Sequence, residues 1–209
     1  MNDPVVFLVD DDPAVLKGLT RLLQSAGWTV APFASAQAFL EALPPAAMGC
    51  LVLDVAMPEM DGLELQRALA QRDHALPIVF LTGHGDIAMG VNAIKYGAAD
   101  FLTKPVGEQQ LIDAVRAAVE RCRGAQHIAL ERASIRRRLA TLTPREREVM
   151  DLVVTGLLNK QIADMLGTVE KTIKVHRARV MDKMQARSLA ELVRLADGAG
   201  IEIPGAHPR

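Results

Sequence analysis

The sequence predicts an α/β domain with a doubly wound, five-stranded parallel sheet, followed by a smaller all-α domain of four helices. Three observations predict this division within the 209 residues. Apolar runs alternate with helix-like periods through residues 1–122. Beyond residue 141, helix caps and glycine stops replace those runs. The distribution of charge also divides the chain. Residues 1–122 hold 8 Lys/Arg and 15 Asp/Glu, whereas residues 123–209 hold 16 Lys/Arg and 10 Asp/Glu.

The strands of the first domain are expected where short apolar runs occur. Residues 5–9 (VVFLV) form an unbroken apolar run, which is typical of a strand buried on both faces. Comparable runs recur along the domain. The predicted strands are residues 5–9, 28–33, 50–54, 77–82 and 99–105.

Amphipathic helices are expected between these strands. Val15 begins an apolar stripe at helical spacing that Gly27 ends, and Gly97 ends a later helix in the same way. The predicted helices lie near residues 15–23, 38–43, 63–69, 88–96 and 108–121. Regular alternation of strands and helices favours a parallel, doubly wound sheet.

Polar side chains end four of the five apolar runs. Asp10 and Asp11 follow the first run, Asp54 ends the third, Thr82 ends the fourth, and Lys104 lies near the end of the fifth. Parallel strands bring their carboxyl ends to one edge of the sheet, where α/β folds bind ligands. We therefore expect three carboxylates, a hydroxyl and an ammonium group to share one pocket.

This set of groups suits phosphoryl chemistry. Carboxylate oxygens are ligands that Mg²⁺ prefers, together with waters and a phosphate. A carboxylate can also act as a nucleophile and form an acyl phosphate, and Asp54 is the candidate because it stands alone on its strand. Lys104 and Thr82 would then contact phosphate oxygens. Asp12 is interpreted as a helix cap or a surplus charge.

Four segments of residues 1–122, namely VDDD, LVLDVAMPEMDG, PIVFLTGHGD and ADFLTKP, resemble the receiver domain of bacterial two-component response regulators. The resemblance implies a flavodoxin-like fold with strand order 2-1-3-4-5 and a cis Lys104–Pro105 bond. It implies that Asp54 is the phosphoacceptor and that Thr82 and Lys104 are phosphate-contact and switch residues. The implied Mg²⁺ ligands are Asp10, Asp11, Asp54 and the carbonyl of Ala56. Phe101 occupies the family's aromatic switch position, although a plain core aromatic remains an equal alternative.

Residues 123–140 are expected to form a charged helical linker that runs on from the last receiver helix and is interrupted at Gly124. Arg136, Arg137 and Arg138 either contact DNA or form a solvated helix face.

The second domain, residues 141–205, begins with a clear capping box. Thr143 is the predicted N-cap, Pro144 the first helical residue, and Glu146 the partner three residues after the cap. A second helix is expected from its cap at Asn159 to Gly167, a third over residues 170–185, and a fourth after Ser188. A short helix, a turn with glycine and a basic helix form a helix-turn-helix pattern.

The third helix has the composition of a DNA-reading helix. Its apolar side is Ile173, Val180 and Met184, whereas residues 170–187 also contain six basic residues and two acids. Such a helix can lie in the major groove with its apolar side on the domain core. The basic residues would supply attraction to phosphates.

Residues 141–197 resemble the LuxR-type four-helix DNA-binding domain, through LTPREREVMDLV, GLLNKQIADMLG, EKTIKVHRARVMDKM and RSLAELVRLA. The whole chain therefore resembles the NarL/FixJ family, closest to its FixJ/StyR branch. The resemblance implies that Lys174, Val175 and Ala178 face bases. It also implies that Lys160, Lys171, Thr172 and Arg177 contact the DNA backbone. Val169 departs from the pattern, since Ser or Thr usually caps the third helix there and a valine side chain cannot.

The expected partners follow from this resemblance. A sensor histidine kinase would phosphorylate Asp54 with Mg²⁺, and the phosphorylated chain would form a homodimer on double-stranded promoter DNA, with RNA polymerase as a further partner. A reducing cytoplasm and no membrane association are expected. No apolar run reaches membrane-spanning length, the N-terminus lacks a basic signal region, and the two cysteines, Cys50 and Cys122, lie far apart.

Two alternative functions share part of this pattern. An aspartate-nucleophile phosphatase would need a general acid two residues after Asp54, but Ala56 stands there. We therefore expect no enzyme, apart from slow autodephosphorylation. A constitutive DNA binder with a vestigial receiver is disfavoured because all the expected receiver residues are present, namely Asp10, Asp11, Asp54, Thr82 and Lys104.

Overall fold

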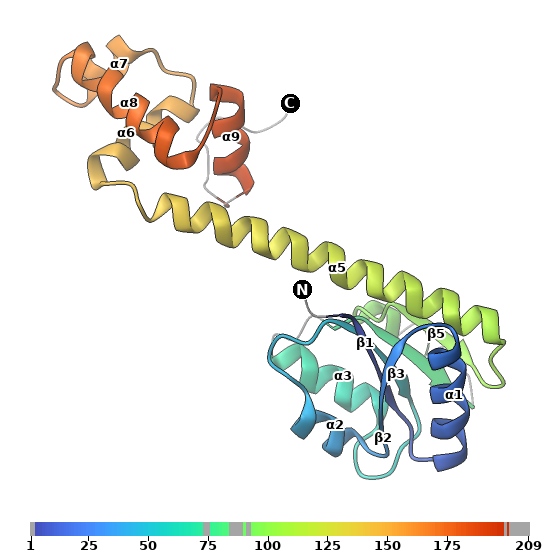
Figure 1. The fold of residues 1–209 in the computed structure, drawn as a ribbon. Helices are drawn as coiled ribbons and strands as arrows, with labels where there is room; N and C mark the ends of the chain where they lie inside the picture. Colours follow the sequence, from blue (N-terminus) through green and yellow to red (C-terminus); the bar gives the residue numbers. More distant parts are fainter. Residues whose placement is uncertain (1–2, 73–75, 84–89, 91–92, 199, 201–209) are drawn as a thin grey trace. The chain divides into compact units, whose positions relative to one another are not determined.

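The computed structural model describes residues 3–72, 76–83, 90, 93–198 and 200. The chain divides into two compact units, Met1–Gln126 and His127–Arg209. The division falls inside the segment predicted as a linker. Figure 1 labels the helices and strands of both units.

The first unit is built on a five-stranded parallel sheet with strand order β2-β1-β3-β4-β5. The strands are β1 (Val5–Val9), β2 (Thr29–Phe33), β3 (Gly49–Asp54), β4 (Ile78–Thr82) and β5 (Asp100–Thr103). The predicted fold class and strand order are confirmed. β5 ends at Thr103, two residues before the predicted end at Pro105, which cannot donate to a strand ladder. Lys104 therefore lies in the loop after the strand.

Helices cover both faces of this sheet (Figure 1). They are α1 (Pro13–Ser25), α2 (Ala36–Ala42), α3 (Gly62–Gln71) and α5 (Glu108–Leu139). Of the helix predicted at residues 88–96, residues 90 and 93–95 are helical, and the other positions up to 92 lie outside the described residues. Gly97 follows with φ +89°, the left-handed conformation expected at a helix end.

The central strands are buried on both faces, which explains their unbroken apolar runs. Phe7 and Leu53 pack on the side of α2 and α3, whereas Leu8 and Val52 pack on the side of α1 and α5. Each such side chain contributes about 1.5–3 kcal/mol by leaving water. Cys50 belongs to the second layer, where burial raises the pKa of its thiol to about 12.

α5 is one helix of 32 residues, and it continues through Gly124. The predicted interruption at Gly124 is wrong, although the predicted continuation of the receiver helix is confirmed. A glycine in a helix interior costs only about 1 kcal/mol relative to alanine, which helix-forming neighbours outweigh. The end of α5 also contributes to the second unit, because Ile135 is 4% exposed and packs in its core.

The second unit is the predicted all-α domain. Its helices are α6 (Pro144–Val154), α7 (Asn159–Met165), α8 (Glu170–Met184) and α9 (Leu189–Gly198). The capping box is confirmed, because Thr143 Oγ1 accepts from Glu146 N and the Glu146 carboxylate accepts from Thr143 N. These helices enclose one apolar core, which includes Met150, Ile162 and Leu192.

One helix start differs from expectation, and a second agrees with it. Asn159 is not the cap of α7, since Leu158 holds the N-cap position and Gln161 Oε1 accepts from Leu158 N at 2.8 Å. The Asn159 carboxamide oxygen instead accepts from Arg177 Nη1 at 3.2 Å. At α8 the N-cap residue is Val169, and no side chain caps the helix.

Candidate functional site

The predicted acidic pocket lies at the carboxyl edge of the sheet. Asp10 and Asp11 follow β1, and Asp54 ends the neighbouring strand β3. One carboxylate oxygen of each lies within 4.8 Å of the others, which is a spacing that a metal ion can bridge. Asp10 and Asp54 are buried, at 1% and 7% exposure, whereas Asp11 is open to solvent.

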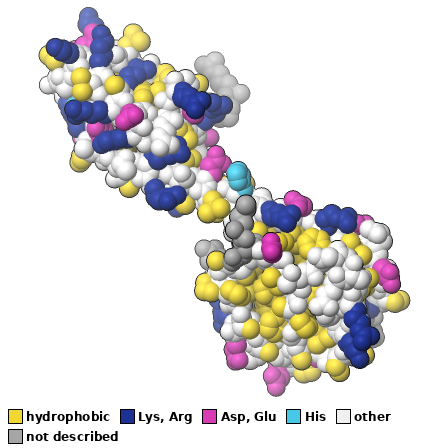
Figure 2. Space-filling model, in the orientation of Figure 1, with side chains coloured by type: hydrophobic (Ala, Val, Ile, Leu, Met, Phe, Trp, Pro, Cys, Tyr) yellow, Lys and Arg dark blue, Asp and Glu magenta, His cyan; other side chains and the backbone are white. Residues whose placement is uncertain are grey.

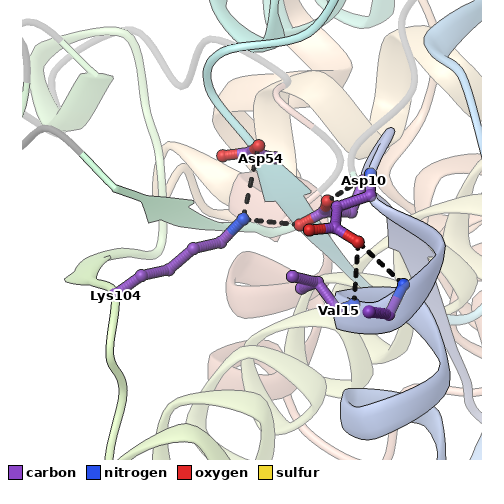
Figure 3. Close-up of polar contacts among 6 residues, drawn as sticks. Asp10, Val15, Asp54 and Lys104 are labelled. Carbon is purple, nitrogen blue, oxygen red and sulfur yellow. Dashed lines mark hydrogen bonds and ion pairs between the residues drawn. The ribbon is translucent and has the colours of Figure 1, made fainter.

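Lys104 reaches into this cluster from the loop after β5. Its Nζ lies 2.6 Å from Asp10 Oδ2 and 3.3 Å from Asp54 Oδ2 (Figure 3). Burial alone lowers the pKa of the Lys104 ammonium, but its hydrogen bond with Asp10 and the charges of Asp10 and Asp54 leave that pKa raised. Lys104 therefore remains a cation placed between two carboxylates.

Asp54 is the least satisfied member of the cluster. Its Oδ1 is buried and has no hydrogen-bond partner in the described structure. Burial raises the pKa of Asp54, and the neighbouring Asp10 charge adds to that rise, so that the lowering by Lys104 is outweighed. A buried carboxylate oxygen without a partner is costly unless a cation or a reaction uses it. The donor set of three carboxylates fits a hard divalent cation.

Asp12 has a separate, local role. Its Oδ1 accepts from Ala14 N at 2.7 Å and from Val15 N at 3.4 Å, and so caps α1 (Figure 3). The prediction of a helix cap is confirmed. Asp12 N in turn donates to Asp10 Oδ1 at 2.9 Å. The cap therefore orients the Asp10 carboxylate that faces Lys104.

The other predicted receiver residues lie around the same edge. Thr82 is the last residue of β4 and is 2% exposed, and its carbonyl accepts from Lys104 N at 2.7 Å. Ala56 lies in the exposed loop two residues after Asp54. Phe101 is half-buried on β5, with its ring centroid 6.2 Å from that of Phe80. The cis form of the Lys104–Pro105 bond is confirmed.

In the second unit, α8 presents one exposed face opposite its buried one. Ile173, Val180 and Met184 are buried in the core. Four predicted DNA contacts share an exposed face at helical spacing: Lys171, Lys174, Val175 and Ala178. Val175 is 45% exposed, so its side chain is accessible on this face. Lys and Arg side chains stand out over α7 and α8 in Figure 2.

The remaining predicted DNA contacts lie on α7 and α8 with differing exposure. Lys160 is exposed at the start of α7, and Thr172 is half-buried. Arg177 is half-buried and donates to Asn159 Oδ1, which joins α8 to α7. The structure thus gathers the predicted set on α7 and α8 but gives Arg177 a structural bond as well.

Two contacts of basic residues were not foreseen from the sequence. Lys183 Nζ lies 2.6 Å from Glu146 Oε2 and donates to the Thr141 carbonyl at 2.9 Å. Arg138 Nη1 donates to the Met184 carbonyl at 3.1 Å. Their partners lie far away in the sequence, so no local pattern indicates them.

Both halves match known families. Residues 6–116 match the family described as response regulator receiver domain, and residues 140–196 match that described as bacterial regulatory proteins, luxR family.

No described helix is both long and apolar enough to cross a bilayer.

Two curated relatives and one solved structure are similar to this chain over most of its length. Nodulation protein W of Bradyrhizobium diazoefficiens is 48% identical over 197 residues, covering 94% of this chain and 87% of that protein. The transcriptional regulatory protein FixJ of the same species is 45% identical over 196 residues, covering 94% and 96%. The low-resolution structure of the response regulator StyR superposes with a TM-score of 0.85 at 46% identity, covering 94% of this chain and 99% of that one.

Proposed function

The chain belongs to the response regulators that join a receiver domain to a LuxR-type DNA-binding domain, in the FixJ/StyR branch, and from this premise we propose a specific mechanism. The protein is a transcriptional response regulator, with a kinase as input partner and DNA as output partner. In our proposal, a sensor histidine kinase transfers a phosphoryl group to Asp54. The observation that supports this is the buried, unpartnered Oδ1 of Asp54 beside Lys104.

The transfer step is a displacement at phosphorus. Asp54 Oδ1 attacks the phosphorus of a phosphohistidine, the P–N bond breaks, and an acyl phosphate forms as the imidazole leaves. Lys104, which now pairs with both Asp10 and Asp54, is placed to contact a phosphate oxygen once the Asp54 carboxylate has become an acyl phosphate. Thr82, at the end of the next strand, would supply the second contact.

The residues that would hold Mg²⁺ are Asp10, Asp11, Asp54 and the Ala56 carbonyl. The ion would supply positive charge that offsets the repulsion between the carboxylates and an incoming phosphoryl group. The spacing of the three carboxylates, within 4.8 Å, supports this assignment.

The output follows from the phosphoryl group, which carries a charge of about −1.5 to −2 at neutral pH where the Asp54 carboxylate carried −1. We propose that it shifts Thr82 and Phe101 between two arrangements and promotes a homodimer. Two α8 helices would then contact half-sites about one DNA turn apart on promoter DNA. Lys174, Val175 and Ala178 would face bases, and Lys160, Lys171, Thr172 and Arg177 the backbone. RNA polymerase is the proposed partner of the bound dimer, in the bacterial cytoplasm.

We propose no enzymatic activity beyond slow self-dephosphorylation. Ala56 has no side-chain acid or base, and it occupies the position from which a general acid would serve Asp54 in an aspartate-nucleophile phosphatase.

The test is intact mass after incubation with acetyl phosphate, with and without Mg²⁺, for the native chain and Asp54→Asn. We expect a Mg²⁺-dependent phosphoryl adduct on the native chain and none on the variant. Light scattering of the same samples should show dimers only where the adduct forms. An unmodified native chain under all conditions would contradict the proposal.

A further inference from the structure

The carboxyl end of α8 is held by groups from outside the helix-turn-helix. Two carbonyls of its last turn are satisfied locally, since Gln185 N donates to Asp182 O and Ala186 N to Met181 O. The Met184 carbonyl accepts instead from Arg138 Nη1, at 3.1 Å, from the last turn of α5. A guanidinium at a helix carboxyl end also opposes the negative end of the helix dipole.

A second bond runs in the opposite direction between the same two regions. Lys183, one residue before Met184, donates to the carbonyl of Thr141, which lies in the turn directly after α5. That turn is itself closed onto α5, because Thr141 Oγ1 donates to the Arg138 carbonyl at 2.7 Å. The end of α5 and the end of α8 are therefore joined by two independent cationic hydrogen bonds.

Arg138 lies in a part of α5 that packs against the core of the second unit. Ile135, one turn earlier on α5, is buried in the core of the second unit. Arg138 is half-buried, whereas its neighbours Arg136 and Arg137 are exposed and make no side-chain hydrogen bond within the described residues. Of this run of three arginines, Arg138 alone is oriented toward the recognition helix.

We propose that Arg138 is a positioning residue for DNA recognition: it holds the carboxyl end of α8 so that the base-facing side chains keep their orientation. The inference rests on the proposed binding of promoter DNA through α8. Met184 and Lys174 lie roughly 15 Å apart along the helix axis. A tilt of a few degrees about the carboxyl end therefore moves Lys174 by on the order of 1 Å. Hydrogen bonds to base edges are sensitive to that displacement, whereas contacts of flexible lysines with phosphates tolerate it.

This role differs measurably from a direct phosphate contact by Arg138. Loss of a phosphate contact weakens binding to all sequences about equally and reduces the salt slope by about 1. Loss of a positioning bond weakens binding to the selected sequence, spares random sequence, and leaves the salt slope unchanged.

The experiment uses the full-length phosphorylated chain and its variants Arg138→Gln, Arg138→Lys and Arg137→Gln. Arg137→Gln is the matched control, because it removes the same charge from the adjacent exposed position. The probes are a duplex enriched from a random library by the native chain, and a random-sequence duplex. Fluorescence anisotropy at several salt concentrations gives both affinities and both salt slopes, and thermal unfolding shows that each variant is folded.

We expect Arg138→Gln to weaken binding to the enriched duplex about tenfold, equivalent to 1.4 kcal/mol. Binding to random duplex should change less than about twofold, with an unchanged salt slope. Arg138→Lys keeps a long, positively charged donor, whereas the glutamine side chain is shorter and neutral, so Arg138→Lys should recover most of the loss. This rescue tests the inference even if Arg138→Gln proves unfolded. Arg137→Gln should match the native chain.

Equal effects of Arg138→Gln and Arg137→Gln, or a salt slope reduced by about 1 in Arg138→Gln, would overturn the inference. A failed rescue by a folded Arg138→Lys would also overturn it. Failure of the proposed function has a different signature, because the native chain would then enrich no duplex at all.

Discussion

Lys183 Nζ lies 2.6 Å from Glu146 Oε2 and ties the last turn of the recognition helix α8 to the first turn of α6. Glu146 is 2% exposed, and its carboxylate also accepts from Thr143 N as part of the capping box. The Glu146 side chain therefore caps the start of α6 and also holds the last turn of α8. These hydrogen bonds, first that of Lys183 and then that of Thr143, lower the pKa of Glu146 from 4.5 to about 2.

The stability of the second unit should depend on Glu146 in a defined pH range. Because the folded pKa lies below the unfolded one, the contribution is complete above about pH 4.5 and is lost as the pH falls toward 2. Glu146→Gln should therefore be less stable than the native chain at pH 7, and the difference should shrink as the pH approaches 3. Urea midpoints across that range measure this. Glu148→Gln, at an exposed ion pair, should show almost no difference, and a pH-independent gap for Glu146→Gln would contradict the assignment.

Removing the cation between Asp10 and Asp54 should destabilise the first unit. Lys104→Met leaves two buried carboxylates facing each other, at a cost of roughly 1–3 kcal/mol in the free energy of unfolding. Added Mg²⁺ should stabilise this variant more than the native chain, because ion binding then relieves more repulsion. Thermal unfolding with and without Mg²⁺ provides the measurement. Lys95→Met, at an exposed lysine, is the control and should change stability by less than about 0.5 kcal/mol.

Val169 offers a stabilising substitution. It holds the N-cap position of α8 without a side-chain hydrogen bond, at 64% exposure, so Val169→Ser should gain a cap and raise the unfolding free energy of the second unit by about 0.5–2 kcal/mol. Val175→Ser, in the exposed middle of the same helix, gains no cap and should give no increase. Chemical denaturation monitored by helix signal distinguishes the two, and equal results for both variants would refute the capping argument.

Two glycines should respond oppositely to alanine. Gly124 lies in the interior of α5 with nothing within 4 Å of an added Cβ, so Gly124→Ala should stabilise by about 1 kcal/mol. Gly49 has φ +137°, and an added Cβ would lie 1.8 Å from the Val5 carbonyl oxygen on the neighbouring strand. Gly49→Ala should therefore separate β3 from β1 and strongly destabilise the first unit. Midpoints of urea unfolding for the two variants should move in opposite directions.

The architecture and the receiver pocket could be predicted from the sequence because both depend on short-range patterns. Unbroken apolar runs indicate strands buried on both faces, as found for β1 and β3. Parallel strands have their carboxyl ends at one edge, so strand-ending residues such as Asp54 and Thr82 must lie near one another. The Thr143 capping box was predictable for the same reason, since its partners are three residues apart.

The sequence by itself thus determined the two kinds of domain, the order of their elements and the group of polar residues at the sheet edge, because these follow from periodicity and topology. Only the tertiary structure decided which partners the basic side chains take. Arg138 meets Met184 across 46 residues, Lys183 meets Glu146 across 37, and Arg177 takes the oxygen of Asn159 that was expected to cap α7. It also decided that one buried oxygen of Asp54 has no partner among the described residues, while Lys104 pairs with the other. Such pairings depend on distances between side chains that packing brings together, and local patterns of residues carry no record of those distances.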